Sequence, residues 1–147
     1  MKRIRRILYA SDFSKASRRA FTTAVAMANS NHASLTILHV HVPVVPLMPE
    51  QYIESATWER LDTQARRWSQ RRLATLAQRA KKAGARATTL LLNGDPTQQI
   101  IRAARSKRAD LVIVGTHGRR GLSKLFLGSV AERVVGTAPC PVVTVRS

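Results

Sequence analysis

The sequence has one cysteine, few aromatic residues and few acids. Cys140 is the one cysteine among 147 residues, and aromatic residues make up 5% of the chain. The sequence has eight Asp and Glu residues but 25 Lys and Arg residues. A single cysteine excludes an intramolecular disulfide and argues against a cysteine-based zinc site. The shortage of aromatic rings weakens the case for a protein that stacks single-stranded bases. The shortage of acids leaves a net charge of +17, a field that attracts polyanions.

Long hydrophobic runs are also missing. No segment approaches the roughly 18 apolar residues that a membrane-spanning helix needs. The basic N-terminus has an apolar part of only Ile7–Ala10, which is too short for the core of a signal peptide. We therefore expect a cytoplasmic protein with no membrane insertion. The length suits one domain around a single core, and we take residues 1–147 as that domain.

Strand-like and helix-like patterns alternate along the chain. Runs of apolar and β-branched residues predict strands at Arg3–Ala10, Leu35–Val42, Arg86–Leu92, Leu111–Val114 and Val142–Val145. Apolar residues at three- and four-residue steps predict helices at 15–30, about 55–83, from Pro96 onward, and about 128–135. This alternation indicates an α/β fold with a mostly parallel sheet and right-handed crossovers.

Cap residues mark several helix ends. Ser14 is expected to cap the first helix, and Asp95 the helix that begins at Pro96, with Gln98 in the position of a capping box. Gly84 is expected to end the long second helix.

The apolar fourth strand is expected to be buried on both faces.

The long helix concentrates the positive charge. Residues 60–86 contain one acid, Asp62, and nine basic residues, Arg60, Arg66, Arg67, Arg71, Arg72, Arg79, Lys81, Lys82 and Arg86. These form either a solvated helix face or a surface for polyanions. We expect an apolar side made of Leu61, Ala65, Trp68, Leu76 and Ala80. Trp58 and Trp68 are expected to pack in the core rather than to stack on bases.

Four of the seven glycines fall between residues 115 and 128. They are Gly115, Gly118, Gly121 and Gly128. Glycine lets the backbone approach a ligand closely, and successive N–H groups form anion-binding nests. Ser129 and Val130 then open a helix, whose first N–H groups suit phosphate. The segment is therefore either a phosphate-binding loop or a structural turn. It carries neither a Walker A motif nor a dinucleotide fingerprint.

Two loops are expected to meet at one edge of the sheet. In open parallel sheets, ligands bind at the carboxyl ends of the strands, where the strand order reverses. Ala10-Ser11-Asp12 follows the first strand, and Val114-Gly115 ends the fourth. If these strands are neighbours, the loops place a carboxylate beside a glycine-rich, basic segment. Asp12 is then either a ligand-binding residue or a cap for the helix at Ser14.

The glycine segment resembles the nucleotide-binding signature of the universal stress protein family. The pattern is Gly115-x2-Gly118-x9-Gly128-Ser129, and its flanks fit as well, at Val112–Arg119, Leu127–Glu132 and Ala138–Val142. The segment Ile7–Ser14 looks like the family's first strand and acidic loop. The resemblance covers essentially the whole chain. It implies an open five-stranded parallel sheet in the order 3-2-1-4-5 with helices on both faces, a Rossmann-like, adenine nucleotide alpha hydrolase-like fold.

The resemblance also implies a site for ATP, or for ADP or AMP, with Mg²⁺ or Mn²⁺ bridging the phosphates. Asp12 and the backbone of Val40 would meet the adenine, and Ala10 and Gly115 would lie near the ribose. The residues that would hold the phosphates are Gly118, Gly128, Ser129 and Val130. The other candidate residues, in the two loops, are Ser11, Val114 and Arg119. Arg119 either reaches a phosphate or is an exposed arginine.

The same resemblance implies a homodimer through the last strand, Val142–Val145. No convincing set of nucleophile, base and acid is evident in the sequence. We therefore predict a nucleotide-responsive regulatory protein of the stress response rather than an enzyme. The alternatives are a slow ATPase and a protein that binds nucleic acid or another polyanion through its basic surface.

Overall fold

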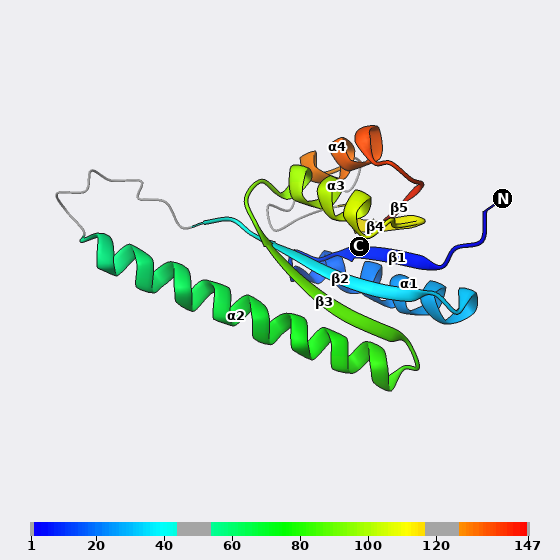
Figure 1. Cartoon of the computed structure of the whole chain (residues 1–147), viewed down its shortest axis with the longest axis horizontal. Helices are drawn as coiled ribbons and strands as arrows, with labels where there is room; N and C mark the ends of the chain where they lie inside the picture. The colour runs from blue at the N-terminus through cyan, green and yellow to red at the C-terminus, as the bar shows by residue number, and fades with distance from the viewer. Residues whose placement is uncertain (1, 44–53, 117–126, 147) are drawn as a thin grey trace.

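Strands and helices alternate along the chain in the computed structural model, which describes residues 2–43, 54–116 and 127–146 (Figure 1). The elements are β1 (Arg6–Ala10), α1 (Lys15–Asn31), β2 (Ser34–His41), α2 (Ser55–Lys82), β3 (Arg86–Asn93), α3 (Pro96–Ser106), β4 (Leu111–Gly115), α4 (Ser129–Thr137) and β5 (Val142–Val145). The strands form one parallel sheet in the order β3-β2-β1-β4-β5, which confirms the predicted fold and strand order. No helix within these ranges combines the length and apolar character needed to cross a membrane.

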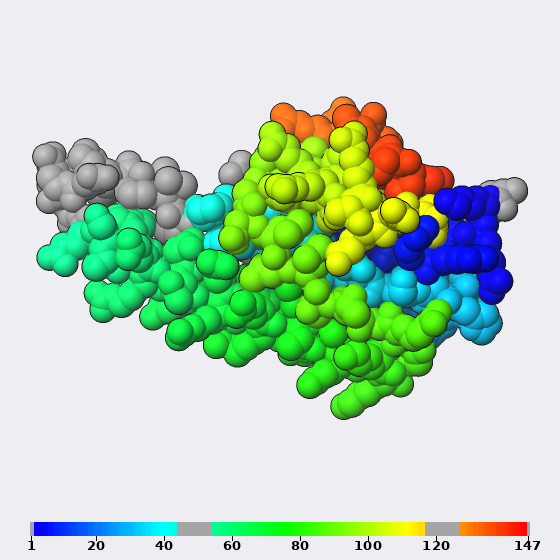
Figure 2. All heavy atoms as spheres, viewed as in Figure 1, coloured from blue at the N-terminus to red at the C-terminus, as the bar shows by residue number. Residues whose placement is uncertain are grey.

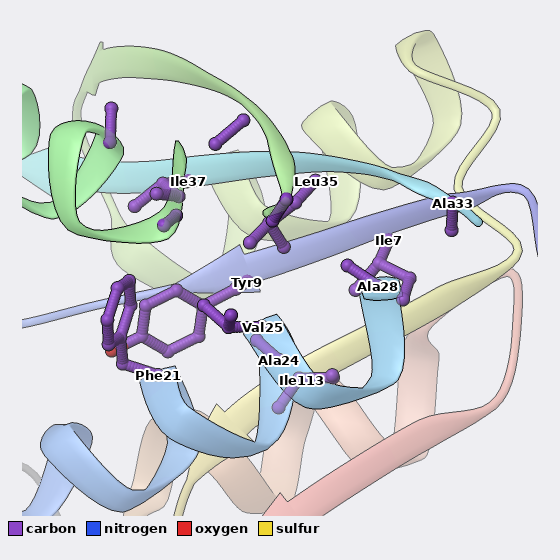
Figure 3. Packing of buried hydrophobic residues seen from close by; sticks show 14 of the residues in the cluster. Ile7, Tyr9, Phe21, Ala24, Val25, Ala28, Ala33, Leu35, Ile37 and Ile113 are labelled. Atoms are coloured by element: carbon purple, nitrogen blue, oxygen red, sulfur yellow. The ribbon is translucent and has the colours of Figure 1, made fainter. Parts of the chain in front are cut away.

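The helices cover both faces of the sheet. Helices α1 and α2 pack on one face, around a core that includes Ile7, Tyr9, Phe21, Leu35 and Ile37 (Figure 3). Helices α3 and α4 pack on the other, around Leu8, Leu38, Ile100, Val112 and Val134. Successive strand residues therefore point to opposite cores. Full burial of one such Leu, Ile or Val side chain contributes about 1.5–3 kcal/mol to the stability of the fold. Strand β4 is buried on both faces, as its apolar sequence predicted.

Tyr9 fixes the start of α1 against the central strand. Its ring lies 5.9 Å from that of Phe21, between centroids. Its hydroxyl donates a hydrogen bond of 2.8 Å to the carbonyl oxygen of Ser17. Burial, the largest influence, raises the pKa of the Tyr9 phenol, so it stays a neutral donor. This contact places the first turn of α1 directly behind the carboxyl end of β1.

The predicted cap residues set the helix ends. The Ser14 hydroxyl accepts a hydrogen bond from the Ser17 N–H at 3.2 Å, and an Asp95 carboxylate oxygen accepts one from the Gln98 N–H at 3.0 Å. Gly84, at φ +93°, follows the last residue of α2 by two positions and turns the chain into β3. Strand β1 begins at Arg6 rather than at Arg3, and its pairing with β2 also begins there.

Helix α2 differs from the prediction. Its buried residues are Ser69, Leu73, Ala77 and Ala80, all in the second half of the helix. Leu61 is 44% exposed and Trp68 is 42% exposed, so placing them on a buried side was wrong. Trp58 and Ala65 are only half-buried. The reason is that the first half of α2 extends beyond the carboxyl ends of most strands, so little of it packs on the sheet (Figure 1).

Asp110 ties the N-terminal segment to the sheet. Its carboxylate accepts hydrogen bonds from the backbone N–H groups of Arg5 at 3.1 Å and Arg6 at 3.0 Å. It also pairs with the Arg6 guanidinium and the Lys2 ammonium, each at 3.5 Å. Burial on its own would raise the pKa of the Asp110 carboxyl. The hydrogen bonds from Arg5 and Arg6 and the positive charge of Arg6 outweigh it and hold that pKa below its ordinary value.

This lowered pKa gives a pH-dependent contribution to stability. The contribution is complete above the unfolded-state pKa of Asp110 and is lost as the pH falls through the lower folded-state pKa. Asp110→Asn should therefore lower the free energy of unfolding at pH 7, and this loss should shrink as the pH falls below the ordinary pKa of a carboxyl group. Urea denaturation at pH 7, 5 and 3 measures this difference. An equal loss at pH 7 and pH 3 would contradict the assigned role of the carboxylate.

Candidate functional site

The strand order reverses between β1 and β4. These strands pair in parallel with Ala10 opposite Val114, so they end side by side. The chain leaves β1 at Ser11 and leaves β4 at Thr116, both at the same edge of the sheet (Figure 1). The two loops that the sequence singled out therefore start next to each other, at the position where open parallel sheets bind ligands.

The loop after β1 is a tight turn built on side-chain hydrogen bonds. The Ser11 N–H donates to the Leu38 carbonyl at 2.8 Å, and the Ser11 hydroxyl accepts from the Phe13 N–H at 3.1 Å. An Asp12 carboxylate oxygen accepts from the Ser14 N–H at 3.0 Å. Asp12 thus supports the turn that leads into α1, but the cap of that helix is Ser14 rather than Asp12. The turn holds Asp12 at the edge of the sheet.

The start of α4 is fixed to the end of β4. The Gly128 N–H donates to the Thr116 carbonyl at 2.6 Å, and the Thr116 N–H donates to the Val145 carbonyl at 3.0 Å. Gly128 is the cap residue of α4 and, as a glycine, has no side chain with which to cap the helix. The N–H groups of Ser129 and Val130 belong to the first turn, where a helix provides no acceptor of its own. They carry the partial positive charge of the helix N-terminus.

Four candidate residues belong to one apolar cluster or pack against it. Val114 belongs to the buried cluster beneath α3 and α4, and Ala10, Val40 and Val130 pack against it. The structure therefore brings residues from β1, β2, β4 and α4 together on one side of the sheet. Gly118 and Arg119 lie outside the described residues.

Gly115 faces the first turn of α1. A Cβ atom at this position would lie 3.6 Å from the Ala16 carbonyl oxygen and 3.7 Å from the Ser17 Cα, which are ordinary contact distances. Packing against α1 therefore does not by itself require a glycine. Gly115 also pairs with Val145 of β5, so its backbone is held in the sheet.

A ring cluster behind the Asp12 turn was not predicted. The Phe13 ring stacks on His39 with centroids 4.2 Å apart and meets Trp68 edge-on at 5.5 Å. The Arg72 guanidinium lies 5.5 Å from the Phe13 centroid and 5.3 Å from that of Trp68. Nδ1 of His39 donates to the Ser11 carbonyl at 2.7 Å. The cluster joins the turn to β2 and to α2.

A second contact joins β2 to the overhanging half of α2. Nε2 of His41 donates to a carboxylate oxygen of Asp62 at 2.7 Å, and the His41 side chain is almost fully buried. No motif in the sequence singles out His39, His41 or Phe13. Their partners become visible only once β2 and α2 are placed side by side.

Two other features of the described residues bear on the site. No group of three or more His, Cys, Asp and Glu side chains within 2–43, 54–116 and 127–146 could hold a metal ion. An open depression of about 750 Å³ lies along α3 and the end of α4 and is lined by Thr97, Gln98, Ile101, Arg102, Arg105, Ser106 and Thr137.

Phe13 offers a test of the ring cluster. Its φ of +63° is left-handed, which costs a residue with a Cβ atom about 1–2 kcal/mol. Phe13→Ala removes the ring but keeps this strain, whereas Phe13→Gly removes both. We expect Phe13→Ala to lower the free energy of unfolding by about 2 kcal/mol or more, and Phe13→Gly by about 1 kcal/mol less than that. Urea denaturation would contradict the assignment if the glycine variant were the less stable one.

Known proteins match this chain along almost its full length. The family model described as Universal stress protein family matches residues 3–146. A universal stress protein of Thermus aquaticus is 36% identical over 149 residues, covering 95% of this chain and 97% of the relative. The structure of UspA from Lactobacillus plantarum matches with a TM-score of 0.86 at 26% identity, over 99% of this chain and 100% of that one. The universal stress protein from Archaeoglobus fulgidus in complex with dAMP has a TM-score of 0.67 at 21% identity, over 99% and 100% of the two chains.

Proposed function

Because this chain belongs to the universal stress protein family, we propose that it binds an adenine nucleotide at the edge where β1 and β4 end. The observation that carries the proposal is the convergence of the Asp12 turn and the start of α4, whose cap residue is the glycine Gly128. A carboxylate accepts hydrogen bonds from an amino group, and helix N–H groups donate to phosphate. The dAMP in the Archaeoglobus fulgidus protein supports the choice of ligand class.

The proposed ligand is ATP, with ADP and AMP as alternatives. Asp12 and the backbone of Val40 would contact the adenine, and Ala10 and Gly115 would lie beside the ribose. Gly128, Ser129 and Val130 would hold the phosphates, and Gly118 and Arg119, outside the described residues, would complete that part of the site. Mg²⁺ or Mn²⁺ would bind the phosphate oxygens and reduce the repulsion between their negative charges.

The proposed role is that of a nucleotide-responsive regulator. A ligand that contacts the Asp12 turn more favourably in one conformation shifts the population towards it. The ring cluster around Phe13 connects that turn to α2, so such a shift would reach a second surface of the protein. A cytoplasmic location and a one-domain organisation over residues 1–147 stay predictions.

Binding can be tested by calorimetric titration of nucleotide-free protein with ATP and Mg²⁺, and then with ADP and AMP. Gly128 has φ −61° and ψ 154°, a conformation open to any residue, so Gly128→Asp should keep the fold. The new carboxylate would cap α4 and stabilise it by a few tenths of a kcal/mol relative to glycine. It would also occupy the N–H groups needed by phosphate and repel the ligand. ATP affinity should therefore fall by at least about tenfold, because the phosphate would lose at least one hydrogen bond to a charged group.

Gly136→Asp is the matched control for this experiment. It adds the same charge near the other end of α4, at an exposed position where a Cβ atom would have no neighbouring atom within 4 Å. This variant should bind ATP as the wild type does. Wild-type protein that binds no adenine nucleotide, or a Gly128→Asp variant that binds as well as the wild type, would overturn the proposal.

Slow hydrolysis of ATP is the alternative to binding alone. Multiple-turnover release of phosphate, lost in a folded Asp12→Ala variant, would favour an ATPase. Release no greater than in a buffer control would leave a binding protein.

We also propose a homodimer through β5. This strand pairs with β4 and ends the strand order of the sheet, and its residues are half-buried. An apolar edge strand with one unpaired side favours pairing with a second copy. Light scattering should give twice the 16.3 kDa mass of one chain. A mass of one chain at all concentrations would contradict the dimer.

A further inference from the structure

Helix α2 carries a stripe of basic and polar side chains along its outer side. The positions follow one another at steps of three or four residues, and all are exposed: Arg60, Gln64, Arg67, Arg71, Thr75, Gln78 and Lys82. Such spacing places residues on one face of a helix. The buried residues of α2 lie roughly 120–180° around the helix axis from the centre of these positions: Ser69, Leu73, Ala77 and Ala80. We refer to Arg60, Arg67, Arg71 and Lys82 as the basic stripe.

The charges of the basic stripe are not neutralised within the described part of the chain. None of its four residues lies in an ion pair there. Of the two acids in α2, Asp62 is bound to His41. Arg67 and Arg71 stand four residues apart, a like-charge spacing that weakens an isolated helix by a few tenths of a kcal/mol. A bound polyanion would remove this repulsion.

The basic stripe is long and lies on an open side of the molecule. From Arg60 to Lys82 it extends about 33 Å along the axis, close to the roughly 34 Å of one turn of B-form DNA. Helix α2 runs along one edge of the molecule (Figure 2). Arginine binds phosphate with a two-pronged geometry, and Gln side chains donate to phosphate oxygens. The Thr75 hydroxyl already donates to the Arg71 carbonyl at 3.0 Å. We propose that the basic stripe of α2 binds double-stranded nucleic acid through the phosphate backbone, without reading the base sequence.

Other polyanions fit the stripe less well. A membrane-surface helix needs large apolar side chains on its docking face, and the stripe positions have none. The exposed Leu61 and Trp68 lie roughly 80–100° around the helix from Arg60. Single-stranded nucleic acid is held by rings on which bases stack, and the Trp68 ring is already in contact with Phe13 and Arg72.

Fluorescence anisotropy with a labelled 24-base-pair duplex, between 50 and 200 mM salt, tests the proposal. Four phosphate contacts give a slope of log K against log salt of about −3.6. Arg60→Gln/Arg67→Gln/Arg71→Gln should weaken binding at least about tenfold and reduce the slope by about 2.7. Glutamine is a good helix former, so the helix should persist, which circular dichroism checks. The matched control, Arg102→Gln/Arg105→Gln/Lys107→Gln, removes three exposed charges from the opposite face of the sheet and should bind as the wild type does.

Several results would overturn the proposal. The first is no binding of the duplex by wild-type protein at 50 mM salt. The second is an equal loss in the control variant, since binding would then follow net charge alone. The third is equally tight, stripe-dependent binding of a 24-nucleotide single strand or of phosphatidylserine vesicles.

Discussion

The pairing of β1 with β4 is the contact on which the rest of the arrangement depends. The central strand, β1, ends at Ala10, which lies opposite Val114 of β4. Both β1 and β4 are buried between the two helix layers. This register brings a turn and a helix start, more than a hundred residues apart in the chain, to one edge of the sheet. The Ser11 and Asp12 hydrogen bonds then shape the turn, and the Gly128–Thr116 hydrogen bond places the first turn of α4 beside it.

The chain has two arrangements of hydrogen-bond donors that suit anions. At the carboxyl edge of the sheet the donors are backbone N–H groups at a helix start, which suit a compact phosphate group. Along α2 the donors are long side chains spaced over about 33 Å, which suit a repeating phosphate backbone. The ring cluster of Phe13, His39 and Trp68 lies between the two surfaces and joins them. A universal stress protein with this charge distribution therefore has more than one surface suited to phosphate.

Much of the fold could be predicted because its signals are local. Ser14 and Asp95 are side-chain caps that act within three residues, and the continuous apolar sequence of β4 reports burial on both faces. The strand order came from the family resemblance rather than from any local pattern. The burial of α2 could not be predicted, since helical spacing defines an apolar side but not where the sheet beneath it ends. Trp68 therefore lies half in solvent.

The site was less predictable than the fold for a similar reason. Asp12 and Gly128 stood out because their residue types suit a carboxylate contact and a helix start. Phe13 and His39 did not, since their role depends on a left-handed turn packed against β2 and α2, which are distant in sequence.

The proposed nucleotide site is tested most directly by following the backbone amide NMR signals of isotope-labelled protein during titration with ATP and Mg²⁺. We predict saturable shifts for Ala10, Ser11, Asp12, Val40, Gly115, Gly128, Ser129 and Val130, with residues 60–82 of α2 much less affected. Shifts confined to α2, or no shifts at millimolar ATP, would contradict the assignment of the site to the edge where β1 and β4 end.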